Sequence, residues 1–161
     1  MKRVSLSLGA NVGDAAETLR NVVSELFVEE KIFDIQVSAM YETLPVGGVE
    51  QPNFYNIAIT AMSELEPLEL LDYVQEIEAR YGRERTTHWG PRTLDIDIVD
   101  IDGMTLTTSR LTLPHPEATK RAFVLIPLLE IAPKMIIAGR SLKEWLSDIE
   151  SSGVTKLEDE M

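Results

Sequence analysis

The chain has 161 residues, of which 44% are hydrophobic and 26% are charged, as in a single globular domain large enough to bury a core. Its formal net charge of −12 argues against nucleic acid or an anionic membrane surface as a partner, because both attract basic proteins. Cysteine is absent and only two histidines occur, which excludes disulfides and thiolate metal sites and disfavours a histidine-rich zinc site.

The first 62 residues predict three strands and one helix. Apolar residues alternate with serines from Val4 to Gly9, which predicts a strand and argues against a signal peptide. Asp14 is placed to cap a helix, and alternation predicts further strands over Ile35–Tyr41 and Tyr55–Met62. The expected apolar stripe of the helix consists of Leu19, Val22, Val23, Leu26 and Phe27. No apolar run approaches the roughly 20 residues of a membrane helix, so we expect a cytoplasmic protein.

The middle of the chain predicts a second helix and a further strand pair. The helix begins near Pro67 and ends at Gly82, and its expected buried positions are Leu70, Leu71, Val74 and Ile77. A fourth strand follows over Leu94–Ile101. Asp102-Gly103 is typical of a hairpin turn, which predicts a short fifth strand near Thr105.

The last third of the chain is less regular. An apolar helical run from Arg121 to Ile131 contains Pro127, where we expect the helix to break or restart. A last short helix over Leu142–Ile149 is expected with Ser141 as its cap. The order β-α-β-β-α-β predicts an α+β fold of the ferredoxin-like kind, an antiparallel sheet with packed helices and extra C-terminal helices, in one domain over residues 1–161.

One segment combines arginines, an aromatic ring and two carboxylates. Four arginines lie between Arg80 and Arg92 with Trp89 among them, and Asp95 and Asp97 follow on the fourth strand. Arginine binds phosphate oxygens with paired donors, whereas carboxylates bind Mg²⁺, so a magnesium-bound polyphosphate would satisfy both. No P-loop or kinase glycine-rich loop is present, so phosphate chemistry would depend on arginines and aspartate-bound metal.

Alternation along the fourth strand places Asp95 and Asp97 on one face, roughly 7 Å apart, close enough to bind one Mg²⁺ or bridge two. The alternative is a solvated polar face continued by Asp100 and Asp102. Likewise, each arginine taken alone is explained as a surface charge, although the loop is longer than a tight connection needs. Trp89 in that loop suits stacking on a flat heterocycle.

Other polar residues lie near this segment in the predicted fold. Gln75 and Glu78 lie one turn apart on the second helix, and the pattern alone favours ordinary helix surface for both. Thr43, Phe54 and Asn56 flank a Pro/Gly-rich loop and suit a pocket for a planar ligand, although Asn56 alone is also explained as a turn cap. His115 lies between two prolines and is equally explained as a hydrogen-bonded loop residue.

Four ordered segments together resemble the 6-hydroxymethyl-7,8-dihydropterin pyrophosphokinase family of folate biosynthesis, from about Val4 to Pro133. They are Ser7–Asp14; Tyr41–Thr43 with Gln51–Asn56; His88-Trp89-Gly-Pro-Arg92-Thr-Leu-Asp95-Ile-Asp97; and Leu113–Pro116 with Arg121–Phe123. The resemblance implies an ATP-dependent diphosphotransferase that gives AMP and the pterin diphosphate. It also implies two Mg²⁺ ions, ATP and the pterin as small-molecule substrates, no nucleic-acid or membrane partner, and a monomer.

The resemblance also implies roles for individual residues. The catalytic residues would be Arg83, Arg92, Asp95 and Asp97, with the two aspartates as the metal ligands. The pterin would bind to Thr43, Leu44, Val46, Phe54, Asn56, Trp89 and Phe123. ATP would bind to Gln75, Glu78, Arg85, Ile98, Arg110, Thr112, His115 and Arg121. Glu117 and Asp100 depart from the family pattern, and we expect them to affect affinity more than reaction type.

Three alternatives to this activity share some of these sequence features. A metal-dependent nucleotidyltransferase also uses paired strand aspartates, but it would transfer AMP to the acceptor. A catalytically silent binding module would share the fold, although Asp95, Asp97, Arg83 and Arg92 are all present. A purely structural ferredoxin-like domain would leave the Trp89 loop unexplained.

Overall fold

A computed structural model of the chain describes residues 1–44, 52–81, 94–151 and 153–157. The strands of its main sheet are β1 (Lys2–Ala10), β2 (Ile32–Val37), β3 (Tyr41–Thr43), β4 (Phe54–Ser63), β5 (Asp95–Ile101) and β10 (Val154–Lys156). The helices are α1 (Ala15–Val28), α2 (Pro67–Arg80), the 3₁₀ turn η1 (Ala118–Lys120), α3 (Ala122–Ile131) and α4 (Leu142–Ser147). Two small ribbons pair β6 (Leu106–Thr107) with β7 (Thr112–Leu113) and β8 (Ile136–Ile137) with β9 (Arg140–Ser141).

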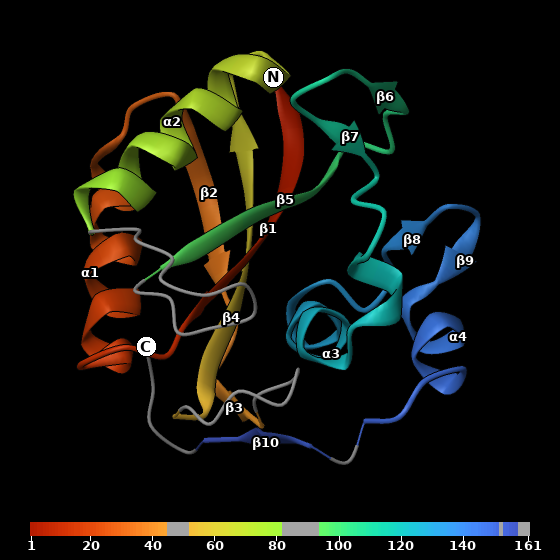
Figure 1. Ribbon diagram of the computed structural model, residues 1–161. Coiled ribbons are helices and arrows are strands. Elements are labelled where there is room, and N and C mark those ends of the chain that lie inside the picture. Colours follow the sequence, from red (N-terminus) through yellow and green to blue (C-terminus); the bar gives the residue numbers. More distant parts are fainter. Residues whose placement is uncertain (45–51, 82–93, 152, 158–161) are drawn as a thin grey trace.

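The main sheet is antiparallel and has the order β10-β3-β4-β1-β5, with β2 also pairing with β4. Helices α1 and α2 lie on one side of it, and α3 and α4 lie on the other (Figure 1). With β2 and β3 counted as one interrupted strand, the elements from β1 to β5 follow the ferredoxin-like order. The predicted α+β fold is therefore confirmed, and the C-terminal helices cover the second sheet face.

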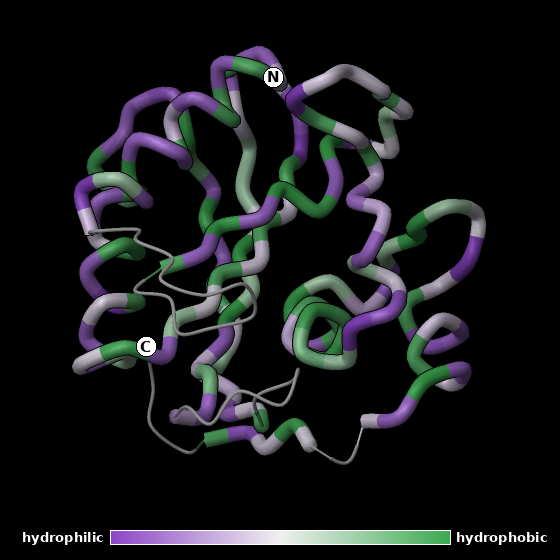
Figure 2. The backbone as a smooth tube through the Cα atoms, viewed as in Figure 1, coloured by the Kyte–Doolittle hydropathy of each residue, from purple (hydrophilic) through white to green (hydrophobic). Residues whose placement is uncertain are grey.

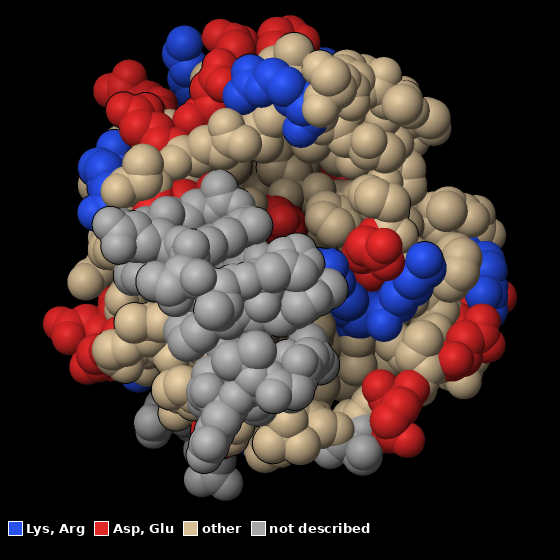
Figure 3. Space-filling view, viewed as in Figure 1, with Lys and Arg blue, Asp and Glu red and all other residues tan. Residues whose placement is uncertain are grey.

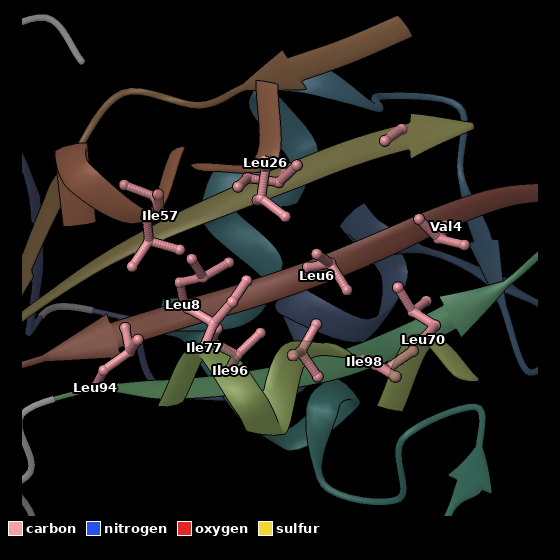
Figure 4. Packing of buried hydrophobic residues seen from close by; sticks show 14 of the residues in the cluster. Val4, Leu6, Leu8, Leu26, Ile57, Leu70, Ile77, Leu94, Ile96 and Ile98 are labelled. Carbon is pink, nitrogen blue, oxygen red and sulfur yellow. The ribbon is translucent and has the colours of Figure 1, made fainter. Parts of the chain in front are cut away.

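The larger hydrophobic core lies between the sheet and helices α1 and α2. Val4, Leu6 and Leu8 of β1 are at most 2% exposed, and alternation directs them to this side while the serines between them face α3. Figure 4 shows Leu26 of α1 and Ile77 of α2 packed against the same strands. Alternation therefore fixes which strand residues form this core and which remain for the opposite face.

A second, smaller cluster lies beneath α3, whose sequence is apolar around most of its circumference (Figure 2). Helix α3 contacts β4 on one side and α4 and η1 on others, which explains why so few polar residues are needed. The expected break at Pro127 is wrong, because α3 continues through it. The proline side chain is buried, and this burial offsets the hydrogen bond that the ring removes.

Both predicted helix caps are confirmed, but one residue predicted to lie in the core is exposed. Asp14 accepts a hydrogen bond from the Glu17 N–H at 3.1 Å, and Ser141 forms a capping box with Glu144. Phe27 was expected in the buried stripe of α1, yet it is 59% exposed. It follows the buried Leu26 by one residue, which turns it by about 100° away from the sheet.

Two strand predictions are corrected. The single strand expected over 35–41 is interrupted at Ser38–Met40, so β2 and β3 pair separately with β4. The strand is interrupted because the Ala39 N–H donates to the Glu130 carboxylate of α3 instead of to a neighbouring strand. Glu130 also accepts from the Tyr41 hydroxyl at 2.6 Å, so the end of α3 is tied to the link between these strands.

The Asp102-Gly103 turn forms, with positive φ at both residues, but the chain does not return along β5. Instead, β6 pairs with β7. Asp100 accepts a hydrogen bond from the Gly103 N–H at 3.0 Å. The register of β5 against β1 shifts between Ser5 and Leu6, which breaks the alternation beyond Ile98. Asp100 pairs with Ser5 as Asp97 pairs with Ser7, so the shift returns Asp100 to the face of Asp97. It is only 8% exposed there, and it stabilises the turn instead of extending a solvated surface.

Asp100→Asn is expected to stabilise the protein at neutral pH by up to about 1 kcal/mol. Burial, reinforced by Asp102, raises the pKa of the Asp100 carboxyl despite the opposing Gly103 hydrogen bond. A raised pKa in the folded state means that stability falls as pH rises through it, because the buried group then ionises. Urea unfolding of both proteins should therefore diverge from about pH 4 to pH 7. A less stable variant at neutral pH would show that the charge-assisted hydrogen bond outweighs burial.

No helix within the described ranges is long and apolar enough to cross a membrane.

Candidate functional site

The predicted metal carboxylates lie on the α3 side of β5. Asp95 and Asp97 are partly exposed, whereas Ile96 and Ile98 between and after them point into the larger core (Figure 4). The predicted alternation is thus confirmed. Within the part of the chain that the structure describes, no group of three or more histidines and carboxylates could hold a metal. The two aspartates would therefore need further oxygen ligands from substrate or water, which is how proteins commonly bind Mg²⁺.

Two basic side chains approach Asp97. The His115 Nε2 atom lies 3.8 Å from one carboxylate oxygen, and an Arg121 guanidinium nitrogen lies 3.7 Å from the other. The Glu117 N–H donates to His115 Nδ1 at 3.1 Å, so in the neutral ring the proton lies on Nε2, directed to the site. Figure 3 shows basic side chains gathered over the η1–α3 region with an acidic side chain among them, and further basic side chains near the rim of this face.

Backbone contacts hold these two residues in place. The His115 N–H donates to the Val99 carbonyl at 2.8 Å, which docks the segment after β7 onto the far end of β5. Arg121 precedes α3, and its guanidinium carbon lies 5.8 Å from the centre of the Phe123 ring. Arg121 therefore connects the carboxylate of Asp97 with the aromatic ring predicted to bind the pterin.

The other predicted pterin residues lie on β3 and β4. Asn56 is 3% exposed, and its amide nitrogen donates to the Thr43 hydroxyl at 2.9 Å. Phe54 is partly buried, and it pairs with Thr43 in the sheet register. Leu44, just beyond β3, is 64% exposed. Thr43 and Asn56 thus form one hydrogen-bonded unit at the β3–β4 end of the site.

Gly9 separates this unit from the metal carboxylates. In the sheet register it lies opposite Asn56 on β4 and opposite Asp95 on β5. A Cβ at Gly9 would lie 2.7 Å from the Asn56 side-chain oxygen, which is closer than nonbonded atoms approach. The missing side chain leaves room between Asn56 and Asp95, here called the Gly9 gap. Sequence analysis did not single out Gly9, although glycine inside a predicted strand is a known signal for such a close approach.

Asn11 is a second residue whose importance the sequence analysis missed. It is 2% exposed, and its amide nitrogen donates to the Pro52 carbonyl at 3.0 Å. It therefore links the end of β1 to the segment that leads into Phe54. The available signal was its position directly after a buried strand, where polar residues often serve binding sites.

The predicted nucleotide residues do not all lie together: His115 and Arg121 lie beside Asp97, whereas the others that the structure describes lie on α2, on β5 and near the β6–β7 ribbon. An Arg110 guanidinium nitrogen lies 3.1 Å from the Gln75 side-chain oxygen and 2.6 Å from Asp72, which joins the β6–β7 ribbon to α2. Thr112 is exposed on the same ribbon. The side chain of Ile98 is 3% exposed in the larger core, so only its backbone is available to a ligand.

Glu78 is more buried than an ordinary helix-surface residue, at 3% exposed. Its carboxylate accepts a hydrogen bond from the Ile96 N–H at 2.7 Å. The alternative that Glu78 is simple helix surface is therefore wrong. Val46, Arg83, Arg85, Trp89 and Arg92 lie outside the described residues, so their predicted roles stay predictions.

Comparison with known proteins identifies the family. Residues 5–133 match the family model described as 7,8-dihydro-6-hydroxymethylpterin-pyrophosphokinase. The 2-amino-4-hydroxy-6-hydroxymethyldihydropteridine pyrophosphokinase of Methylorubrum extorquens is 41% identical over 158 residues, covering 98% of this chain and 100% of that protein. The bifunctional protein FolKE of Lactococcus lactis subsp. lactis is 40% identical over 94% of this chain, which spans only 44% of that protein.

Solved structures support the same fold. The Plasmodium falciparum HPPK-DHPS crystal structure with pteroate superposes with a TM-score of 0.71 over 91% of this chain and 42% of that chain. The two are 16% identical, so this likeness concerns the fold alone. The Methylorubrum relative matches from end to end, and the family model spans both the Asn56 and the Asp97 halves of the site. The chain thus belongs to the 7,8-dihydro-6-hydroxymethylpterin-pyrophosphokinase family.

Proposed function

We propose that this chain transfers the β,γ-pyrophosphoryl group of ATP to the hydroxymethyl oxygen of 6-hydroxymethyl-7,8-dihydropterin, in folate biosynthesis. AMP and the pterin diphosphate are the products. The observation that carries the proposal is the pair Asp95 and Asp97 on one strand face, with Arg121 and His115 within 4 Å of Asp97. The name of the full-length relative from Methylorubrum extorquens supports the choice of substrate.

Asp95 and Asp97 would hold Mg²⁺, and we propose two ions. The partial exposure and the shared strand face of the two aspartates fit this metal, which proteins usually bind through one or two carboxylates plus substrate phosphates. Bound Mg²⁺ would neutralise developing negative charge and favour ionisation of the attacking hydroxyl. The protein's contribution is to keep two anionic oxygen donors on one rigid strand beside cationic and hydrogen-bond-donating side chains.

Arg121 and His115 would orient the triphosphate. Both already face the carboxylate that is to hold the metal, and the Nε2–H of His115 and the N–H groups of Arg121 suit phosphate oxygens. Phosphoryl-type transfer needs alignment and charge neutralisation more than a strong base. Arg83 and Arg92 would supply further positive charge during transfer, and Arg85 would bind ATP.

The pterin would bind at the other end of the Gly9 gap. Asn56 would read the amide edge of the ring, and its hydrogen bond to Thr43 fixes the orientation of its amide group. Phe54 and Phe123 would stack on the two faces of the ring, with Leu44, Val46 and Trp89 completing the pocket. This arrangement would direct the hydroxymethyl group toward Asp95 and Asp97.

The adenosine part of ATP would lie along the edge of β5 and α2. The proposed contacts are the side chains of Gln75, Arg110 and Thr112 and the backbone of Ile98, with Glu78 close by. The contact of Arg110 with Gln75 supports a common site for these residues. We further propose that the chain acts in the cytoplasm as a monomer, on small-molecule substrates alone.

Separation of the nucleotide products tests the activity. The protein is incubated with ATP, Mg²⁺ and 6-hydroxymethyl-7,8-dihydropterin, and the products are resolved by chromatography. AMP formed in step with the pterin diphosphate is the expected result. Pyrophosphate released with an adenylylated pterin would instead identify a nucleotidyltransferase, and saturable binding without turnover would identify a silent relative.

Gly9→Ala is expected to raise the KM for the pterin by about tenfold, with a smaller effect on the KM for ATP. The new methyl group would displace the buried Asn56 side chain and break its hydrogen bond to Thr43. Steady-state kinetics with each substrate varied in turn measures the effect. The KM for ATP, measured on the same variant, is the internal control. Equal loss for both substrates would contradict a local role for Gly9.

A further inference from the structure

Strand β5 carries the proposed metal ligands, but it lies at the edge of the main sheet. Its neighbour on one side is β1, and no strand within the described ranges pairs with its other side. Backbone N–H groups on such an edge need another partner, and an edge strand without one is more mobile than a central strand. The position of Asp95 and Asp97 therefore depends on what covers this edge.

Glu78 of α2 covers it at one point. Its carboxylate oxygen lies 2.7 Å from the Ile96 backbone nitrogen, and the side chain is 3% exposed. Burying a carboxylate costs free energy unless hydrogen bonds compensate for the lost water, and a bond to a charged acceptor is stronger than one between neutral groups. An apolar residue would fill the same volume at lower cost, so a hydrogen-bond acceptor at this position indicates a purpose beyond packing.

This hydrogen bond holds the backbone of the one residue that lies between the two aspartates. Ile96 is the single residue that separates them, and its side chain faces the core while theirs face the site. Fixing the Ile96 N–H fixes the peptide plane between Asp95 and Ile96, and it restricts the directions of both neighbouring side chains. The anchor itself is rigid, because Leu70, Val74 and Ile77 of α2 are completely buried against the sheet.

We propose that Glu78 is a positioning residue for the metal site, which acts through the Ile96 backbone and not by touching the nucleotide. This inference rests on the proposed function in one respect, namely that Asp95 and Asp97 bind the metal. Helix α2 would then hold the metal ligands in place from outside the site, and loss of such support typically lowers metal affinity about 10–100-fold.

Three variants separate this role from charge and from direct nucleotide contact. Glu78→Leu removes the acceptor, and Glu78→Gln keeps an acceptor but removes the charge. Glu76→Gln is the matched control, because Glu76 is on the same helix, its side chain is 69% exposed, and it lies 3.9 Å from Arg80. Two quantities are measured, the exchange rate of the Ile96 amide hydrogen by NMR and the Mn²⁺ affinity in the presence of a non-hydrolysable ATP analogue.

We expect Glu78→Leu to lower the Mn²⁺ affinity by about tenfold and to accelerate Ile96 exchange by a similar factor. Glu78→Gln should stay within about threefold of wild type in both measurements, and Glu76→Gln should change neither. Binding of AMP without metal should be unchanged in all three variants, since a direct nucleotide contact would weaken it. If Glu78→Leu does not fold, Glu78→Ala is subject to the same expectations.

Two results would overturn the proposal. One is a Mn²⁺ affinity in Glu78→Leu equal to that of wild type. The other is an equal loss in Glu78→Gln and Glu78→Leu with unchanged Ile96 exchange, which would assign the effect to charge alone. Failure of the proposed function would look different, because wild type would then form no pterin diphosphate even though these binding measurements could still show the expected pattern.

Discussion

Replacing Asp97 with asparagine is expected to lower kcat by about three orders of magnitude. The substitution keeps the shape of the side chain but replaces one of the two carboxylates proposed to hold Mg²⁺ with a neutral amide. It also removes the charge that faces His115 and Arg121 at 3.8 and 3.7 Å. The initial rate of AMP formation, measured over a range of Mg²⁺ concentrations, reports the effect.

The fold should survive this change, because Asp97 lies on the site face of β5 and the core residues beside it are untouched. We expect a melting temperature within a few degrees of wild type. Asp102→Asn is the control, since it makes the same chemical change in the exposed turn after β5, at a positive φ that asparagine also tolerates. Normal turnover of Asp97→Asn at unchanged Mg²⁺ would exclude Asp97 as a metal ligand.

Arg121→Ala is expected to reduce kcat/KM for both substrates by about 10²- to 10³-fold. The guanidinium lies 3.7 Å from Asp97 and its central carbon lies 5.8 Å from the Phe123 ring. It is therefore placed to contact phosphate on one side and to support the pterin-stacking ring on the other. Steady-state kinetics with either substrate varied, together with the Kd of each, separates binding from chemistry.

Arg140→Ala is the matched control for Arg121→Ala. Arg140 also lies over an aromatic ring, 4.4 Å from Trp145, and pairs with a carboxylate, Asp148 at 2.8 Å, but it belongs to the β8–β9 ribbon and its contacts are with α4. It should leave kcat/KM within about twofold of wild type. If Arg121→Ala affected only the KM for ATP, Arg121 would be a simple phosphate anchor with no connection to the pterin pocket.

Local patterns in the sequence predicted most of the fold. Strict alternation in β1 and β5 gave the correct faces for Leu6, Leu8, Asp95 and Asp97, because one buried face constrains every second residue. The errors arose where tertiary contacts decide. Glu130, about 90 residues away in the chain, interrupts the strand at Ala39, and no local pattern reveals such a partner. Burial likewise keeps α3 helical through Pro127.

The site was predicted less evenly. The metal pair belongs to one segment of the resemblance, whereas His115 and Arg121 belong to another. The structure places both of these residues within 4 Å of Asp97, a contact that the sequence analysis did not predict. Gly9 was missed because its role depends on the register that places it between β4 and β5, which cannot be read from β1 alone. The support of β5 by Glu78 was missed for a related reason, since helix periodicity reports burial but not the partner.

The Gly9 gap has a consequence for inhibitors and for resistance to them. Asn56 and Asp95 lie on strands separated by two inter-strand spacings, roughly 10 Å. A bicyclic heterocycle held by Asn56 and joined by a short linker to an anionic, metal-binding group would therefore span both halves of the site. Mutation of Gly9 to a larger residue would exclude such a compound, but it would displace Asn56 and obstruct the substrate as well. Resistance by that route would reduce the activity of the resistant strain.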